Sequence, residues 1–406
     1  MNRISILENP VMEYVWGSGT AIQSLLGQPE SVGKPLAELW MGAHPKAPSK
    51  VLVDEGLKRL DEVIERDPES ILGEDIARRF SSKLPFLFKL LAAETPLSLQ
   101  VHPNLKQAQA GFARENRLGI PLIAPHRNFR DESHKPELLC ALTYFKGLKG
   151  FRKINEIMDL MGRVSSSTLS ALLGRLRKEP DSRGLERFFT SVMSMEEPSQ
   201  RLMVSEAVKL AERYAGEDEA FNWMVKLNQE YPGDIGVLSP GILNLVQLVP
   251  GEAIYIPPGE PHAYLHGLGI ELMAASDNVL RCALTTKHVH IQELLKIISF
   301  EIEPLRIMRP LSDGPCQRTY STPAEEFLLS VISVDEGGPF SSPQDRSVEI
   351  LICLTGEADI IELSTGQPLR MTRGKSVIVP SLISRYRIEG NATLYKASVP
   401  ALTRDL

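Results

Sequence analysis

Two short segments, far apart in this chain, follow the same pattern of glycine, apolar strand and proline. Residues 250–257 read PGEAIYIP and residues 373–380 read RGKSVIVP. In each segment the glycine favours a tight turn, the apolar run favours a β-strand, and the proline ends it. A repeated unit of this kind is typical of duplicated small β-barrels of the jelly-roll type. The pattern therefore predicts two such barrels.

The two copies differ at one position. His262 follows Pro257 by five residues, whereas Arg385 follows Pro380 by five, and no histidine occurs after residue 304. Imidazole is the commonest protein ligand for transition metals. The C-terminal copy has lost that ligand position, and it is predicted to be structural.

Short apolar runs bounded by Pro and Gly predict most of the chain's regular structure to be strand. Turn signals at 94–96 and 250–252 predict two hairpins, the first between the runs at 86–91 and 97–101. The second hairpin would join residues 243–249 to residues 253–256. Tail strands are predicted at residues 327–334, 348–354, 358–363, 376–379 and 393–397.

Helical spacing appears in two places. Leu57, Leu60 and Ile64 predict a helix inside the first β-rich block. Between residues 152 and 230, leucine and methionine stripes with helical periodicity predict several helices, broken at Pro180 and Pro198. One such stripe comprises Leu169, Leu172, Leu173 and Leu176. We interpret these stripes as core packing.

These observations together predict a mainly β protein with a helical insert, consisting of two jelly-roll β-barrels and an α-helical domain. The first barrel is predicted in two parts, residues 1–150 and 235–304. The helical domain would occupy residues 151–234, and the second barrel residues 305–406.

Composition excludes several classes of protein. A net charge of −6 favours neither nucleic acid nor an anionic membrane as partner. No apolar run approaches the roughly 18 residues that would span a bilayer, and the N-terminus lacks a secretory pattern. The cysteines are scattered without the spacing of a zinc ribbon or a redox motif; they are Cys140, Cys282, Cys316 and Cys353. We expect a cytoplasmic protein.

A Gln-x-His pair is the first candidate for metal binding. Gln100 and His102 lie in a predicted strand, where side chains two residues apart point the same way. Segments 134–137 and 257–264 add two histidines and a glutamate. Imidazole, carboxylate and amide oxygen together suit a divalent metal of borderline hardness, with zinc as the first expectation. Spacing alone leaves His134 and Glu137 as competing ligands.

Six motifs, in order along the chain, carry a resemblance to a known family. They are residues 16–17, 40–45 (WMGAHP), 94–103 (ETPLSLQVHP), 134–137 (HKPE), 257–264 (PPGEPHAY) and 269–281 (GIELMAASDNVLR). The chain resembles the type I mannose-6-phosphate isomerases (phosphomannose isomerases) over nearly its whole length. The resemblance implies two cupin-like barrels, a helical domain, and interconversion of mannose 6-phosphate with fructose 6-phosphate.

The resemblance also implies one zinc ion per chain. The family's ligands carry over onto Gln100, His102, Glu137 and His262. Two neutral imidazoles, one carboxylate and one amide leave the ion a net positive charge, as a catalytic zinc requires.

Further residues are assigned to the reaction, which moves a proton between C2 and C1 through a cis-enediol(ate). The resemblance places an essential arginine at Arg281 and a pocket lysine at Lys135. Arg281 would stabilise the charge on the enediolate oxygen. We favour Glu271 as the base, with Asp277, Lys135 and Tyr264 as alternatives or relays. Glu271, Asp277 and Arg281 are expected on one strand, as one wall of the site.

Substrate contacts are less constrained, because no glycine-rich phosphate loop is present. Lys89 is a candidate for the phosphate if its strand pairs with that of Gln100, and Ser98 is another. Trp16 is a candidate for stacking on the sugar, with core packing as the alternative.

Two other functions fit part of the pattern. A cupin-type metal oxygenase would use iron held by His102, Glu137 and His262, although Gln100 would fill a position that oxygen chemistry needs open. A non-catalytic sugar-binding cupin would not need Lys135, Glu271 and Arg281. We expect a monomer that acts on a small sugar phosphate, with a dimer as the alternative.

Overall fold

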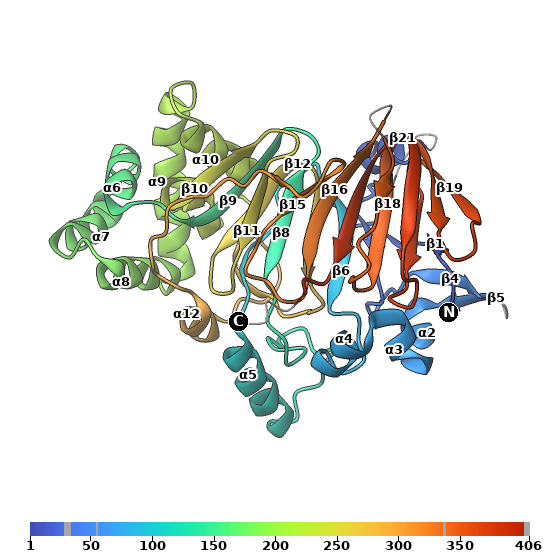
Figure 1. The fold of residues 1–406 in the computed structure, drawn as a ribbon. Helices are drawn as coiled ribbons and strands as arrows, with labels where there is room; N and C mark the ends of the chain where they lie inside the picture. Colours follow the sequence, from blue (N-terminus) through green and yellow to red (C-terminus); the bar gives the residue numbers. More distant parts are fainter. Residues whose placement is uncertain (28–33, 54–55, 336–337, 402–406) are drawn as a thin grey trace.

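The computed structural model describes residues 1–27, 34–53, 56–335 and 338–401. Two large sheets lie beside each other, and a cluster of helices covers the outer side of one of them (Figure 1). The mainly β fold with a helical insert is therefore confirmed. None of the described helices is long and apolar enough to cross a membrane.

The first sheet has ten strands, all paired antiparallel. Its longest strand, β12, pairs with four others: β6, β7, β8 and β9. Strand β7 also pairs with β13, and β8 with β11. The strands are β2 (Val11–Met12), β3 (Glu38–Met41), β6 (Phe86–Ala93), β7 (Leu99–Val101), β8 (Glu137–Ala141), β9 (Phe145–Phe151), β10 (Leu243–Leu248), β11 (Ala253–Ile256), β12 (His262–Ala274) and β13 (Leu280–Ala283).

The second sheet has eleven strands and unites the two ends of the chain. Strand β1 pairs with β20 on one side and with β4 on the other. The predicted division of the chain into a two-part first barrel, a helical domain and a second barrel stays a proposal. The strands are β1 (Ser5–Glu8), β4 (Lys50–Val53), β5 (Gly56–Arg59), β14 (Leu311–Ser312), β15 (Gln317–Tyr320), β16 (Leu328–Val334), β17 (Phe340–Ser341), β18 (Glu349–Glu362), β19 (Pro368–Thr372), β20 (Ser376–Val379) and β21 (Tyr386–Ser398).

The helical insert lies between β9 and β10, as its periodicity predicts. Its leucine stripe is buried, Pro180 separates two helices, and Pro198 lies in the first turn of another, where proline is tolerated. The insert comprises α6 (Ile154–Arg163), α7 (Ser167–Lys178), α8 (Ser182–Met193), α9 (Glu197–Tyr214) and α10 (Glu219–Glu230). The remaining helices are α1 (Ala21–Leu25), α2 (Leu60–Arg66), α3 (Pro68–Leu72), α4 (Glu74–Arg79), α5 (Leu105–Arg117), η1 (Ile235–Leu238), α11 (Ser239–Ile242) and α12 (Ile291–Ile297).

Both predicted hairpins are wrong, although their strands exist. Strand β6 pairs with β3 and β12, while β7 pairs with β12 and β13. Likewise β10 pairs with β9, and β11 with β8. Consecutive strands of a jelly-roll barrel often enter different sheets, so a turn between two strands does not identify their partners.

Two boundaries also differ from the prediction. Leu57 lies in β5, opposite Leu52, so the helix predicted from it begins only at Leu60. In the tail, the runs at 348–354 and 358–363 merge into β18, whose register shifts between Cys353 and Thr355. A bulge lets one long strand bend where the sequence suggests two.

An apolar cluster joins the two barrels. Phe86, Phe88 and Ile270 from the first sheet pack in one buried cluster with Leu329 and Ile350 from the second. Burial of side chains this large contributes roughly 1.5–3 kcal/mol each. The second barrel therefore forms a rigid support for the strands of the first.

Candidate metal centre and active site

Three buried side chains converge in the first barrel: His102, Glu137 and His262. Their ligating atoms all lie within 4.8 Å of one another. Glu137 lies between the two histidines, with its Oε1 3.2 Å from His102 Nε2 and its Oε2 3.3 Å from His262 Nε2. These residues come from the end of β7, from β8 and from β12, and β12 pairs with both of the other strands.

Backbone contacts fix the orientation of the two imidazole rings. His102 Nδ1 lies 2.7 Å from the backbone oxygen of Asn278, and His262 Nδ1 lies 2.9 Å from that of Glu260. Only a protonated nitrogen can donate to a carbonyl, so in the neutral form of each ring Nε2 carries the lone pair. Both nitrogens face the carboxylate oxygens of Glu137, and among the described residues His102 Nε2 has no hydrogen-bond partner. Two imidazole nitrogens and a carboxylate that converge in a buried site are a donor set typical of zinc.

The protonation states of these groups suit zinc. Burial, reinforced by the Lys135 charge, lowers the pKa of His102 to about 4. Burial by itself would raise the pKa of Glu137, but Lys135 and His102 bring it well below its usual value. At neutral pH the site therefore offers uncharged imidazole and charged carboxylate, the forms that bind metal.

Gln100 extends the donor set. It lies opposite His262 in the β7–β12 pairing, and its amide nitrogen is 3.3 Å from His262 Nε2. A half-turn of the amide exchanges nitrogen for oxygen without moving the side chain. The amide oxygen can thus serve as the fourth ligand.

His134, the competing ligand, lies elsewhere. Its Nε2 contacts the carboxylate of Glu326, just before β16 in the second barrel. The geometry therefore favours Glu137 over His134 at the metal.

Two further candidates contact Glu137 directly. Lys135 Nζ is 3.0 Å from Glu137 Oε1, and the Tyr264 hydroxyl donates to Glu137 Oε2 over 3.3 Å. Burial, reinforced by Glu271 and Glu137, holds the pKa of Tyr264 well above its usual value. The phenol stays protonated and acts as a donor.

Lys89 and Glu271 form a buried ion pair. Lys89 Nζ lies 2.8 Å from Glu271 Oε2 and 3.4 Å from Glu38 Oε1, on the strands β12 and β3 that flank β6. Burial would lower the pKa of Lys89, but Glu271 and Glu38 raise it overall. The pairing of β6 with β7, which would have set Lys89 opposite Gln100, does not occur. Lys89 instead forms ion pairs with two carboxylates, so its charge is poorly available to a phosphate.

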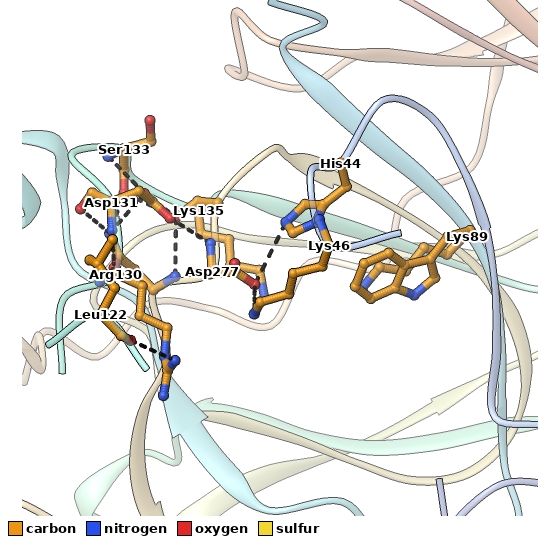
Figure 2. Close-up of polar contacts among 12 residues, drawn as sticks. His44, Lys46, Lys89, Leu122, Arg130, Asp131, Ser133, Lys135 and Asp277 are labelled. Carbon is orange, nitrogen blue, oxygen red and sulfur yellow. Dashed lines mark hydrogen bonds and ion pairs between the residues drawn. The ribbon is translucent and has the colours of Figure 1, made fainter. Parts of the chain in front are cut away.

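Asp277 faces the same site from a different element. Its carboxylate lies 2.8 Å from Lys46 Nζ and 3.6 Å from His44 Nε2 (Figure 2). Burial would raise the pKa of Asp277, but Lys46 and His44 lower it overall. Asp277 therefore stays ionised.

The expectation of one strand for Glu271, Asp277 and Arg281 is wrong. Glu271 lies in β12, Arg281 in β13, and Asp277 in the loop between them. The Asp131 carboxylate accepts the Asp277 backbone N–H over 2.7 Å (Figure 2). The buried Asn278 amide donates to the backbone oxygens of Asp131 and Ser133. These side-chain bonds replace strand pairing and turn the chain.

Arg281 lies opposite Gln100 in the pairing of β13 with β7. Within the described residues, no carboxylate forms an ion pair with it. Burial lowers its pKa, and the nearby Arg130 charge lowers it further. Lys287 responds in the same way to burial, Arg281 and Arg130. Arg130, Arg281 and Lys287 thus lie close enough for their charges to interact, and among the described residues none of the three forms an ion pair with a carboxylate.

Sequence reasoning missed several of these residues. Arg130 and Lys287 complete the cationic cluster, and His44 and Lys46 hold Asp277. The one available signal was His44, which lies within the WMGAHP motif at 40–45. Arg130 and Lys287 lie in loops without a recognisable pattern.

The two remaining candidates lie at the edge of the site. Trp16 stacks on Tyr14 with ring centroids 5.5 Å apart, and Tyr14 is close enough to Glu38, Lys89 and Asp277 for their charges to act on it. Trp16 also packs on a buried apolar cluster, as the alternative role of core packing predicts, and its stacking on the sugar stays a prediction. Ser98 is half-buried and immediately precedes β7.

Comparisons with known proteins identify the family to which this chain is similar. Residues 4–154 match the model of the phosphomannose isomerase type I catalytic domain, and residues 317–399 match the mannose-6-phosphate isomerase cupin domain. The mannose-6-phosphate isomerase of Escherichia coli K12 is 38% identical, covering 96% of this chain and 97% of its own. The human enzyme is 32% identical over 92% of each chain.

Solved structures agree with the sequence matches. A variant of phosphomannose isomerase from Salmonella typhimurium superimposes with a TM-score of 0.90 at 35% identity, covering 98% of this chain and 100% of its own. A zinc-bound mannose 6-phosphate isomerase gives a TM-score of 0.89 at 35% identity, with the same coverage. The resemblance first suggested by the motifs is confirmed, and this chain belongs to the type I phosphomannose isomerase family.

Proposed function

We propose that this protein interconverts mannose 6-phosphate and fructose 6-phosphate with one zinc ion held by Gln100, His102, Glu137 and His262. The observation that carries the proposal is the convergence of two buried imidazole nitrogens on the Glu137 carboxylate, a donor set that suits a divalent metal. Zinc, when bound, supplies a Lewis acid that polarises the substrate's oxygens.

Two carboxylates at the site are held in different states. Burial raises the pKa of Glu271, only partly offset by Lys89, whereas Asp277 stays ionised beside Lys46 and His44. A base that takes a proton from carbon and returns it works best with a pKa closer to neutrality. Glu271 is therefore the proposed base, which moves the proton from C2 to C1.

The other groups hold charge and position. Arg281, next to the metal strand β7 and without an ion-paired carboxylate among the residues that the structure describes, stabilises the negative oxygen of the enediolate. Lys135 and Tyr264 orient Glu137 and are the proposed relays. Asp277 is an alternative base, disfavoured by its lowered pKa.

The phosphate is best accommodated by Arg130 and Lys287, the cations that adjoin Arg281. An unpaired cationic cluster is stabilised by a dianion, which brings negative charge at no cost to an existing ion pair. Ser98 remains a proposed hydrogen-bond donor, and Trp16 a proposed wall for the sugar. Lys89 could reach a phosphate only by leaving Glu38 and Glu271.

We also propose that the protein acts as a monomer in the cytoplasm, with neither nucleic acid nor membrane as partner. Light scattering of the purified chain tests the monomer against a dimer, and fractionation of cells tests the compartment.

The deciding experiment is conversion of mannose 6-phosphate to fructose 6-phosphate by purified protein, before and after chelation and after zinc is restored. Loss on chelation and recovery with zinc would support both reaction and metal. Absence of turnover with zinc fully bound would overturn the isomerase, and oxygen uptake with iron would support an oxygenase instead. Sugar phosphate binding without either reaction would indicate a binding protein.

A further inference from the structure

Asp234 connects the helical insert to the strand that carries Arg281. It lies between α10 and η1, at the end of the insert. Its Oδ1 accepts N–H groups from Gly236 at 2.8 Å and Leu284 at 2.9 Å, and its Oδ2 accepts that of Thr285 at 3.3 Å. Leu284 directly follows β13. The Asp234 carboxylate thus accepts backbone N–H groups both from Gly236 in η1 and from the segment that follows β13.

The turn that Asp234 holds is an unfavourable one. Leu284 is buried and has a φ of 54°, in the left-handed region that residues with a Cβ avoid. Such a conformation persists only where the surroundings impose it. A Cβ on Gly236 would lie 2.7 Å from Ala283 Cβ and from Leu284 Cγ, so the insert approaches as closely as glycine allows.

The hydrogen bonds continue from this turn to a cation of the proposed phosphate site. The Thr285 hydroxyl accepts the backbone N–H of Lys287 over 3.1 Å. Asp234, Thr285 and Lys287 therefore form a continuous chain of contacts. Its far end is close enough to Arg281 for the two charges to act on each other. Like charges repel, so something must hold the loop in this position.

We propose that Asp234 is a positioning residue, through which the helical insert places Lys287 beside Arg281 and thereby sets the affinity for the substrate's phosphate. The inference rests on the proposed function in one respect, the assignment of these cations to phosphate. It gives the insert a role in substrate binding beyond packing.

The test compares Asp234→Ala with a matched variant, Asp218→Ala. Asp218 caps α10 in the same insert by accepting the Ala220 N–H over 2.8 Å, and within the described part of the chain it makes no hydrogen bond to β13. The measurements are kcat, KM for mannose 6-phosphate, and the dissociation constant of inorganic phosphate by calorimetry. Asp234→Ala should weaken phosphate binding and raise KM by about tenfold, the effect expected for loss of charge-assisted hydrogen bonds. Its kcat should change much less. Asp218→Ala should leave all three near wild type.

Two further variants separate positioning from general damage. Asp234→Asn retains an accepting oxygen and should recover most of the phosphate affinity. In a Lys287→Ala background, Asp234→Ala should weaken phosphate binding less than about twofold, because the group it positions is gone. Equal effects in both backgrounds would overturn the inference, and so would equal losses from Asp234→Ala and Asp218→Ala.

Failure of the proposed function gives a different result. If wild-type protein binds phosphate but does not turn over mannose 6-phosphate, the isomerase is overturned while the calorimetric comparison of Asp234 variants still decides the inference. If Lys287→Ala binds phosphate as the wild type does, the phosphate assignment is wrong, and the positioning role of Asp234 falls with it.

Discussion

The two barrels each bury a cluster of three charged side chains, with opposite composition. In the first barrel Lys89 lies between Glu38 and Glu271. In the second, Glu349 lies between Arg346 at 3.3 Å and Lys396 at 3.1 Å. Arg346 also donates to the backbone oxygens of Ser347 and Pro380, so its cluster is tied into the fold.

The difference lies in what surrounds each cluster. Beside Lys89 and Glu271 are two imidazoles that face the Glu137 carboxylate and an arginine without an acidic partner among the described residues. Nothing comparable accompanies Glu349, and Arg385, the counterpart of His262 in the repeated segment, is exposed. One barrel keeps polar groups available for a ligand, while the other uses its charges for its own structure.

The largest effect should come from the position where the repeats diverge. His262→Ala removes a proposed zinc ligand, so both bound zinc and turnover should fall. Turnover should fall by more than about 1000-fold, because even residues that only hydrogen-bond to a metal ligand contribute about 10- to 100-fold. Arg385→Ala is the matched variant and should change neither. Zinc content by mass spectrometry of the metal decides the matter, and retention of one zinc per chain in His262→Ala would contradict the assignment.

The carboxylates of the two clusters should then separate rate from structure. Glu271→Gln should lower kcat at least about 100-fold, the contribution of a general base, with little change in KM. Glu349→Gln should leave kcat per folded molecule unchanged. Steady-state kinetics on both variants tests this contrast. A kcat for Glu271→Gln within tenfold of wild type would move the base to Asp277, Lys135 or Tyr264.

Glu349→Gln should instead lower the stability of the protein. Glu349→Gln leaves two buried cations without their carboxylate, and loss of one partner in a buried ion pair costs about 3 kcal/mol or more. The free energy of unfolding, measured with denaturant, should fall by that amount. A change below roughly 1 kcal/mol would show that backbone oxygens alone satisfy Arg346 and Lys396.

The pH profile should respond to the Lys89 charge. Glu271 must be ionised to act as base, and its pKa is already raised by burial, so activity should fall on acidification at a pH above the usual carboxyl range. Lys89→Met removes the charge that holds this pKa down. The acid limb of kcat should therefore move to higher pH, by about one unit or more. If the acid limb of kcat does not move in Lys89→Met, this limb reflects the ionisation of a group other than Glu271.

The smallest effect concerns the glycines of the repeated segments. Gly251 and Gly374 have similar φ values, 86° and 84°, so alanine is strained at both, by about 1 kcal/mol. At Gly251 the new methyl would meet open space, whereas at Gly374 it would lie 3.0 Å from backbone atoms of Leu26. Gly374→Ala should thus lower the midpoint of thermal unfolding more than Gly251→Ala does, and equal shifts would argue against a tight contact with Leu26.

Much of the molecule follows from local pattern. The helical insert and several strands of both barrels could be predicted from the amino-acid sequence, and so could the four proposed zinc ligands once the family resemblance was included. Residue spacing within one strand directs Gln100 and His102 to one side, and helical periodicity identifies the buried stripe of α7. The family motifs supply the remaining ligands, and the described geometry brings three of them together.

The pairing of the strands could not be predicted, because it depends on contacts between segments that are distant in the chain. Strand β12 pairs with four strands, and no turn signal reveals which. The same holds for charge: whether Lys89 is available to a phosphate depends on Glu38 and Glu271, and the surroundings of Arg281 depend on two loops. A side chain's type is a property of the sequence, whereas its pKa and its available hydrogen bonds depend on the neighbours that the tertiary structure supplies.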